Sequence, residues 1–372
     1  MATESTDPPL TGLRVVELAA IGPVPLACMM LADLGADIVR IDRPEPGELD
    51  VIPAEQRDPV LRGRRSVRAE LRDPAAREKI VDLADRADVF VEGNRPGTAE
   101  RLGLGPEVLC ARNSRLIYGR MTGWGQDGPE AGTAGHDINY LSVTGALHAL
   151  GRRDEPPPVP LNLIGDYGGG ATFLVIGILA ALQERHRSSH GQVIDAAMVD
   201  GIGTLLQPVL SWRAAGIWSD ERESNILDGA APYYATYACA DGRHLAVGAI
   251  ENRFYGELLA GLGLDIANIP DRGDKENWPR LRVSFARVFA TRSRDEWVAI
   301  FAGTDACVTP VLSFPEAADH PQNRARGTLV GRNGDLETAP APRFSRSAHG
   351  AGESARWVEV NEVLAEWSSP DR

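Results

Sequence analysis

Three short segments of the sequence carry side chains that could take or give a proton. His136 precedes an apolar-periodic stretch, Asp166 comes just before three consecutive glycines, and Glu251 follows a later apolar run. Histidine and carboxylate side chains are the usual general acids and bases of enzymes. These three residues are therefore the candidate acid–base constellation of the chain.

The surroundings of two of these residues predict how they are held. Asp137 suits the N-cap of a helix, which would place His136 just before the helix start. Free backbone N–H groups and the positive end of the helix dipole could hold a developing oxyanion there. Beyond Asp166, the run Gly168–Gly170 is expected to bring the backbone close to a ligand.

Each of these residues also has a purely structural interpretation. A histidine near a helix start is often a surface or capping residue. Asp166 could be only the N-cap of the apolar helix that follows it, and Glu251 could be a surface acid. Spacing alone does not choose between the structural and the catalytic interpretations.

The elements that must position these residues alternate between strand and helix. Strands are predicted at 13–18, 37–41 and 88–92, with helices at 26–34 and 75–87. This alternation predicts a parallel, Rossmann-like sheet and an α/β fold class. A nicotinamide site is rejected, because the first turn has one glycine, Gly22, where G-x-G-x-x-G is needed.

The composition changes along the chain and predicts two domains. Around the turn Asp241–Gly242 the pattern is that of a hairpin, and helical segments are predicted to follow it near 253–262, 278–290 and 294–302. The large Rossmann-like domain is predicted at 1–196 and completed by 340–372, with a smaller α+β domain at 227–320. A helical linker at 197–226 and a return linker at 321–339 are predicted to join the two domains.

A cluster of arginines stands out in this acidic protein. It is predicted to lie in loops after the carboxyl ends of parallel strands, where α/β sheets bind ligands. Guanidinium forks suit phosphate oxygens, so a ligand such as coenzyme A would fit, although a solvated surface is the plain alternative. The cluster contains Arg57, Arg62, Arg64, Arg65, Arg68 and Arg72, with Arg43, Arg95 and Arg101 nearby.

Charge and composition exclude several other classes of function. The formal net charge of −13 opposes nucleic-acid binding. No apolar run approaches the roughly 20 residues of a membrane-spanning helix, so no membrane partner is expected. Four cysteines without close spacing indicate a reducing cytoplasm. Seven histidines without ligand spacing predict no metal site.

The sequence resembles the family III CoA-transferases, the CaiB/BaiF group, and within it the bacterial α-methylacyl-CoA racemases. The resemblance rests on a series of different motifs spread along almost the whole chain. These motifs are Leu13–Leu18, Asp33–Asp37, Arg40–Pro44, Glu92–Gly97, Arg101–Gly105, Thr122–Gln126, Gly135–Tyr140, Gly165–Asp166, Asp228–Gly229 and Ala231–Tyr234.

The resemblance implies roles for particular residues. His136 and Asp166 match the two catalytic bases of the racemases, Asp137 adjoins the first of them, and Glu251 matches a glutamate that supports the histidine. The coenzyme A site is implied at Arg43, Arg95, Arg101 and the backbone near Ala69. An interlocked homodimer is implied, with each site shared between the large domain of one subunit and the small domain of the other.

The chemistry implied is racemisation of a 2-methylacyl-CoA thioester through an enolate. Two bases on opposite faces of the α-carbon would suffice, with no cofactor beyond the coenzyme A of the substrate. The main alternative is a CoA-transferase in which Asp166 is the nucleophile. The pair His136 and Glu251 favours the racemase. A non-catalytic thioester-binding protein is a third possibility, and the acyl chain stays open.

Overall fold

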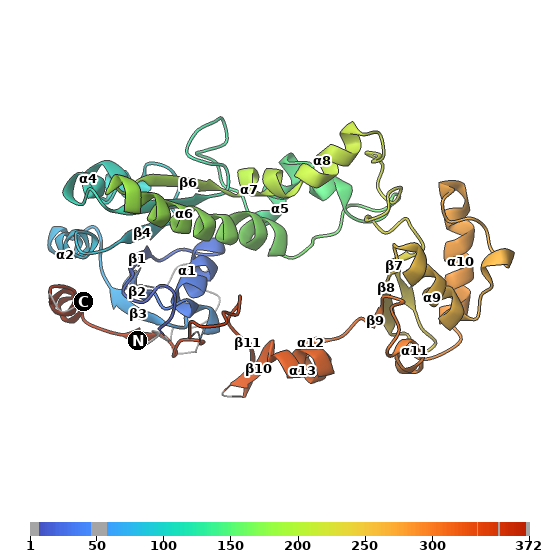
Figure 1. Cartoon of the computed structure of the whole chain (residues 1–372). Coiled ribbons are helices and arrows are strands. Elements are labelled where there is room, and N and C mark those ends of the chain that lie inside the picture. The colour runs from blue at the N-terminus through green and yellow to red at the C-terminus, as the bar shows by residue number, and fades with distance from the viewer. Residues whose placement is uncertain (1–6, 46–57, 333, 349, 370–372) are drawn as a thin grey trace. The chain divides into compact units, whose positions relative to one another are not determined.

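A computed structural model describes residues 7–45, 58–332, 334–348 and 350–369 of the chain (Figure 1). The chain divides into two compact units. The first contains Met1–Thr144, Pro160–Leu206 and Thr328–Arg372, and the second contains Gly145–Val159 and Gln207–Gly327.

A seven-stranded parallel sheet organises the first unit (Figure 1). Its strand order is β12-β3-β2-β1-β4-β5-β6, and every neighbouring pair is parallel. Val15, Val16, Val39 and Val91 are fully buried, as expected for strands covered on both faces. The strands are β1 (Arg14–Leu18), β2 (Asp37–Asp42), β3 (Arg64–Arg68), β4 (Val89–Glu92), β5 (Ile117–Thr122), β6 (Val193–Ala197) and β12 (Arg356–Trp357).

Helices cover both faces of this sheet. On one face, α2, α4 and α14 share a core with strand residues such as Val16 and Phe90. On the other, α1 packs on α6, and α6 contacts β5 and β6. The helices of the unit are α1 (Pro23–Asp33), α2 (Pro74–Ala84), α3 (Thr98–Arg101), α4 (Pro106–Arg112), α5 (Asp137–Val143), α6 (Thr172–Ser188), α7 (Met198–Leu205), α14 (Val360–Trp367), the 3-10 turn η1 (Pro59–Leu61) and the π-helix η3 (Leu163–Ala171). The hairpin β10 (Leu329–Arg332) and β11 (Asp335–Thr338) completes it.

The strand order places a topological switch between β1 and β4. From β1 the chain builds outward through β2 and β3, and then returns to the other side of β1 with β4. Ligands of open α/β sheets bind in the crevice at such a point, beyond the carboxyl ends of the strands. The predicted Rossmann-like parallel sheet is confirmed.

One helix of the described residues is long and apolar enough to cross a membrane by length and composition. It is the continuous helix Leu163–Ser188, formed by η3 and α6, in which an 18-residue window has a mean hydropathy of 1.6. The sequence-based statement that no run approaches this length was wrong. Its apolar side chains belong in part to the protein core, because Leu174 and Ile178 are fully buried and α6 packs on β5 and β6.

The second unit is built on a three-stranded antiparallel sheet. Its strands β7 (Tyr234–Ala238), β8 (His244–Gly248) and β9 (Val308–Pro310) pair in that order. An aromatic core including Tyr237, Phe285, Phe289 and Trp297 joins the sheet to helices. The helices are α8 (Gln207–Ala214), α9 (Asn252–Leu262), α10 (Trp278–Phe289), α11 (Arg294–Phe301), α12 (Phe314–Asp319) and α13 (Pro321–Arg326), with 3-10 turns η2 (Leu147–Ala149), η4 (Ile266–Asn268) and η5 (Lys275–Asn277).

The compact units divide the chain at other points than the predicted domains. Helix α7 packs on η3 and so belongs to the first unit, although the linker was predicted to begin at 197. Residues 145–159, predicted in the large domain, join the second unit. The reason is local, because the guanidinium of Arg222 donates hydrogen bonds to the carbonyls of His148, Arg152 and Glu155.

Candidate active site

His136 lies at the N-terminus of α5. It is the N-cap of this helix, and its backbone N–H donates to Oδ1 of Asn139 at 3.0 Å. The residue is exposed. Asp137 was predicted as the N-cap, but it is the first helical residue and its side chain turns into the protein. The helix has only seven residues, so its dipole is small, and an oxyanion role for its N–H groups stays a prediction.

Asp166 lies inside η3 rather than at a helix start. The interpretation of Asp166 as the N-cap of the apolar helix is therefore wrong, because the chain is already helical from Leu163. π-Helical turns are rare and occur often at functional sites. The amide of Asn162, four residues earlier, donates to Oδ2 of Asp166 at 3.2 Å and holds the carboxylate.

One hydrogen bond joins the two segments. The backbone N–H of Asp166 donates to Oδ2 of Asp137 at 2.7 Å. Asp137 is buried, and its Oδ1 has no hydrogen-bond partner among the described residues. Gly165 makes room for this contact, since a Cβ there would lie 2.5 Å from Oδ2 of Asp137.

The electrostatic surroundings of Asp166 suit a proton carrier. Burial raises the pKa of its carboxyl above 3.8, and the negative charge of Asp137 raises it further. The hydrogen bond from Asn162 and the charge of His136 lower the pKa and only partly offset these effects. A raised carboxyl pKa brings an aspartate closer to the operating pH of a general acid or base.

The carboxylate of Asp166 lies at the switch point of the sheet. Gly22, just beyond the carboxyl end of β1, has φ +67°, and a Cβ there would lie 3.0 Å from Oδ2 of Asp166. Only glycine combines that backbone with that approach. Gly22 is not part of a dinucleotide-binding motif. Its lack of a side chain instead leaves room for the carboxylate of Asp166 at the position where open α/β sheets bind ligands.

The glycines after Asp166 serve packing. A Cβ at Gly169 would lie 2.9 Å from the backbone nitrogen of Ile202 in α7, and one at Gly170 would lie 3.0 Å from Cβ of Pro23. The expectation that this run brings backbone and ligand together stays a prediction. Its role is to let η3 sit directly against α7 and α1.

Three arginines of the predicted phosphate cluster are buried in ion pairs. Arg62 pairs with Asp33 at 2.5 Å, Arg64 with Glu17 at 2.8 Å, and Arg65 with Asp37 at 2.8 Å. The sequence placed them in loops, but Arg64 and Arg65 lie in β3. Their charges are used inside the fold, so the cluster as a whole is not a phosphate site. Arg57 lies outside the described residues.

Other arginines remain exposed at the carboxyl edge of the sheet. Arg43 follows β2, Arg68 ends β3, and Arg95 follows β4. Arg101, in α3, is exposed and donates to Oγ1 of Thr98 at 2.9 Å. Ala69 is buried at the same edge, with its N–H bonded to the carbonyl of Asp42 at 3.0 Å. These arginines place positive charges at the edge, and its predicted coenzyme A site stays a prediction.

Glu251 belongs to the second unit, whereas His136 and Asp166 belong to the first. It is exposed and occupies the N-cap position of α9, where its carbonyl accepts the N–H of Tyr255 at 2.9 Å. The predicted support of His136 by Glu251 stays a prediction.

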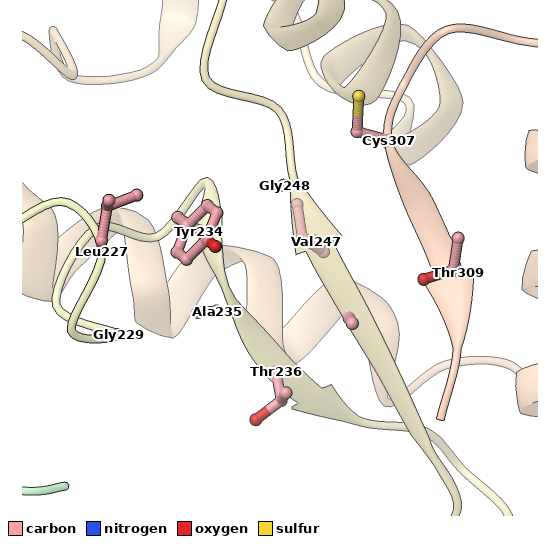
Figure 2. A pocket seen from close by; sticks show the side chains of 10 residues that line it. Leu227, Gly229, Tyr234, Ala235, Thr236, Val247, Gly248, Cys307 and Thr309 are labelled. Atoms are coloured by element: carbon pink, nitrogen blue, oxygen red, sulfur yellow. The ribbon is translucent and has the colours of Figure 1, made fainter. Parts of the chain in front are cut away.

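A pocket of about 470 Å³ opens on the sheet of the second unit (Figure 2). Figure 2 shows Leu227 and Tyr234 at one side and β9 with Thr309 at the other. No charged residue lines it, so it suits an apolar group better than a phosphate. Its walls are Leu227, Gly229, Tyr234, Ala235, Thr236, Ala246, Val247, Gly248, Cys307 and Thr309.

Two residues of the site escaped the sequence-based predictions. Asn162 carries a weak signal, since it precedes Asp166 by four residues, which is one helical turn. Gly22 entered the sequence analysis only as the single glycine of a turn that lacks the G-x-G-x-x-G motif. Within the described ranges, no group of three or more His, Cys, Asp or Glu residues could hold a metal ion.

An open parallel sheet with a carboxylate at its switch point defines an α/β enzyme with a ligand site at the carboxyl edge. The chain belongs to CoA-transferase family III, whose model matches residues 10–358.

Proteins similar to this chain include racemases. It is 44% identical to the alpha-methylacyl-CoA racemase of Mus musculus over 91% of this chain and 87% of that protein. Identity to the Homo sapiens racemase is also 44%, over 90% of this chain and 86% of that one. A crystal structure of a CAIB/BAIF family protein from Brucella suis is 28% identical, with a TM-score of 0.83, and the match covers 97% of this chain and all of that one.

Proposed function

We propose that this protein is an α-methylacyl-CoA racemase, which interconverts the two epimers of 2-methylacyl-CoA thioesters. The observation that carries the proposal is the hydrogen bond from the Asp166 N–H to Asp137, the residue next to His136, together with the raised pKa of Asp166. The 44% identity to two racemases supports it.

In this mechanism the two residues act on opposite faces of the α-carbon. One removes the proton, an enolate forms, and the other returns a proton to the opposite face. Each residue serves as base for one epimer and as acid for the other. A thioester α-proton is weakly acidic, so the enolate oxygen also needs hydrogen-bond donors. The backbone N–H groups at the start of α5 are the predicted donors. No further cofactor is proposed.

The coenzyme A moiety anchors the substrate at the carboxyl edge of the sheet. Arg43, Arg95 and Arg101 are exposed there and suit phosphate oxygens. Remote binding of this kind holds the reacting carbon between the two bases.

We also propose that the enzyme works as an interlocked homodimer in which Glu251 supports His136 of the other subunit. Exposed apolar side chains near His136 support an interface there, because monomers rarely expose such patches. They come from elements that contact one another, namely Ile138 and Val143 of α5, Leu163 of η3 and Leu205 of α7. All four cysteines are free, which fits a reducing cytoplasm.

The second candidate is a CoA-transferase, which the family name itself favours. In that reaction Asp166 would attack the thioester carbonyl and carry the acyl group as an anhydride. A single-epimer 2-methylacyl-CoA, incubated with a free carboxylic acid, separates the two. Loss of chirality without new thioester supports the racemase, and transfer of coenzyme A to the acid with chirality retained supports the transferase.

A further inference from the structure

The turn that carries Glu251 connects β8 to α9. Ala249 is fully buried at its start, whereas Ile250, Glu251 and Asn252 are exposed. An exposed glutamate on a connection has many rotamers and backbone positions open to it, so a defined role for its carboxylate requires something that fixes the turn.

Arg272 supplies two hydrogen bonds to this turn. Its Nη1 donates to the carbonyl of Ala249 at 3.1 Å, and its Nη2 donates to Oδ1 of Asn252 at 2.6 Å. The two acceptors stand immediately before and after Ile250–Glu251. The planar fork of one guanidinium therefore spans the turn and ties both of its ends.

Arg272 is itself held by aromatic rings of the same unit. Its guanidinium carbon lies 4.7 Å from the ring centre of Tyr233 and 4.3 Å from that of Tyr255. Both rings are buried, and cation–π contacts are stronger away from water. The indole N–H of Trp278 also donates to the Arg272 carbonyl at 2.8 Å. Tyr255 closes the arrangement, because its N–H binds the carbonyl of Glu251.

We propose that Arg272 is a positioning residue for Glu251. In this role it acts through Glu251, because it fixes the backbone from which the carboxylate extends. Its catalytic consequence rests on the proposed function, in which Glu251 supports the catalytic histidine. We call the two hydrogen bonds from Arg272 to Ala249 and Asn252 the clamp. The clamp lies within the second unit, and its effect on the turn can be measured without any substrate.

Amide hydrogen exchange of the full-length protein tests the clamp. In Arg272→Gln, exchange in the peptide spanning 249–256 should rise at least about tenfold, because the Tyr255 N–H loses its fixed acceptor. Exchange in α10 and α11 should stay as in wild type, which shows that the variant is folded. Arg280→Gln, which changes an exposed arginine on α10, is the matched control and should leave 249–256 unchanged. Unchanged exchange at 249–256 in Arg272→Gln overturns the clamp.

Kinetics test the consequence for Glu251. Arg272→Gln should lower kcat for racemisation by about ten- to a hundredfold with KM within about twofold. Arg272→Lys should recover only part of this, since an ammonium cannot span both acceptors. Combining Arg272→Gln with Glu251→Gln should give little further loss, because both changes remove one function. Fully additive losses overturn the positioning role. If wild-type protein does not racemise, the proposed function fails, and exchange still decides the clamp.

Discussion

The backbone N–H of Asp166 donates to Oδ2 of Asp137 over 2.7 Å, across 29 positions of sequence. Asp137 directly follows His136, which is one candidate base. The donor of the hydrogen bond is the backbone of Asp166, whose carboxylate is the other candidate base. This hydrogen bond therefore joins the start of α5 to the π-helix η3, two elements that also pack on each other. The segments of the two candidate bases are thus linked through a third residue, Asp137, that need not react.

The first prediction concerns this contact. Asp137→Ala leaves the Asp166 N–H without its acceptor and should cost about 1–3 kcal/mol of unfolding free energy. Activity should fall by about a hundredfold through misplacement of Asp166. The control is Asp137→Asn, whose amide oxygen can still accept the bond and should keep most of the stability. Urea unfolding and kcat measure both effects. Equal destabilisation by the two variants would show that the bond does not matter.

The second prediction follows from the raised pKa of Asp166. Burial favours its neutral form, so its stabilising contribution is complete below the ordinary value of 3.8 and is lost as pH rises through the raised value. Charged Asp166 therefore destabilises the fold at pH 7. Asp166→Asn should be inactive yet more stable than wild type at neutral pH, with the difference vanishing in acid. Unfolding at several pH values checks this, and lower stability of the variant at pH 7 would contradict it.

The third prediction separates binding arginines from structural ones. Arg43→Ala and Arg101→Ala should raise KM for a full CoA ester, and raise it less for a truncated pantetheine ester. Arg64→Met is the contrast, because it removes one of the two arginines that pair with buried Glu17, the other being Arg40, and should cost about 1–3 kcal/mol of stability. Equal KM effects on both esters would remove Arg43 and Arg101 from the phosphate site.

The fourth prediction concerns the proposed interlocked dimer. Co-expressed His136→Ala and Glu251→Ala chains form some mixed dimers, in which one shared site carries both changes and the other carries neither. Purified mixed dimers should recover about half of the normal activity per dimer, although each parent is impaired. Mixed dimers no more active than the parents would show that Glu251 serves the His136 of its own chain.

Much of the fold could be predicted from local sequence patterns. Strands β1 and β2 are runs of branched apolar residues, and the predicted helices of the second unit agree with α9, α10 and α11 to within a residue or two. Strand β3 was missed because Arg64 and Arg65 look like surface residues. Their charges are neutralised by Glu17 of β1 and Asp37 of β2, and such pairing depends on tertiary structure.

The site was predicted only in part for the same reason. His136 and Asp166 could be selected by residue type and resemblance. Two contacts depend on distant segments that meet at the switch point. Asp137 accepts a hydrogen bond from the Asp166 N–H, and Gly22 lies close to the carboxylate of Asp166. The π-helical turn that orients Asp166 has no sequence pattern of its own.

The proposed racemisation requires His136 and Asp166 to act on opposite faces of one α-carbon. Its most direct test is single-turnover exchange in D₂O from each separate epimer of a 2-methylacyl-CoA. Wild type should place deuterium at the α-carbon and yield both epimers. His136→Ala should slow proton removal from one epimer by about 10²–10⁴-fold and from the other far less, and Asp166→Ala should show the reverse preference. Equal losses from both epimers in both variants, or racemisation without deuterium in the product, would contradict the two-base account.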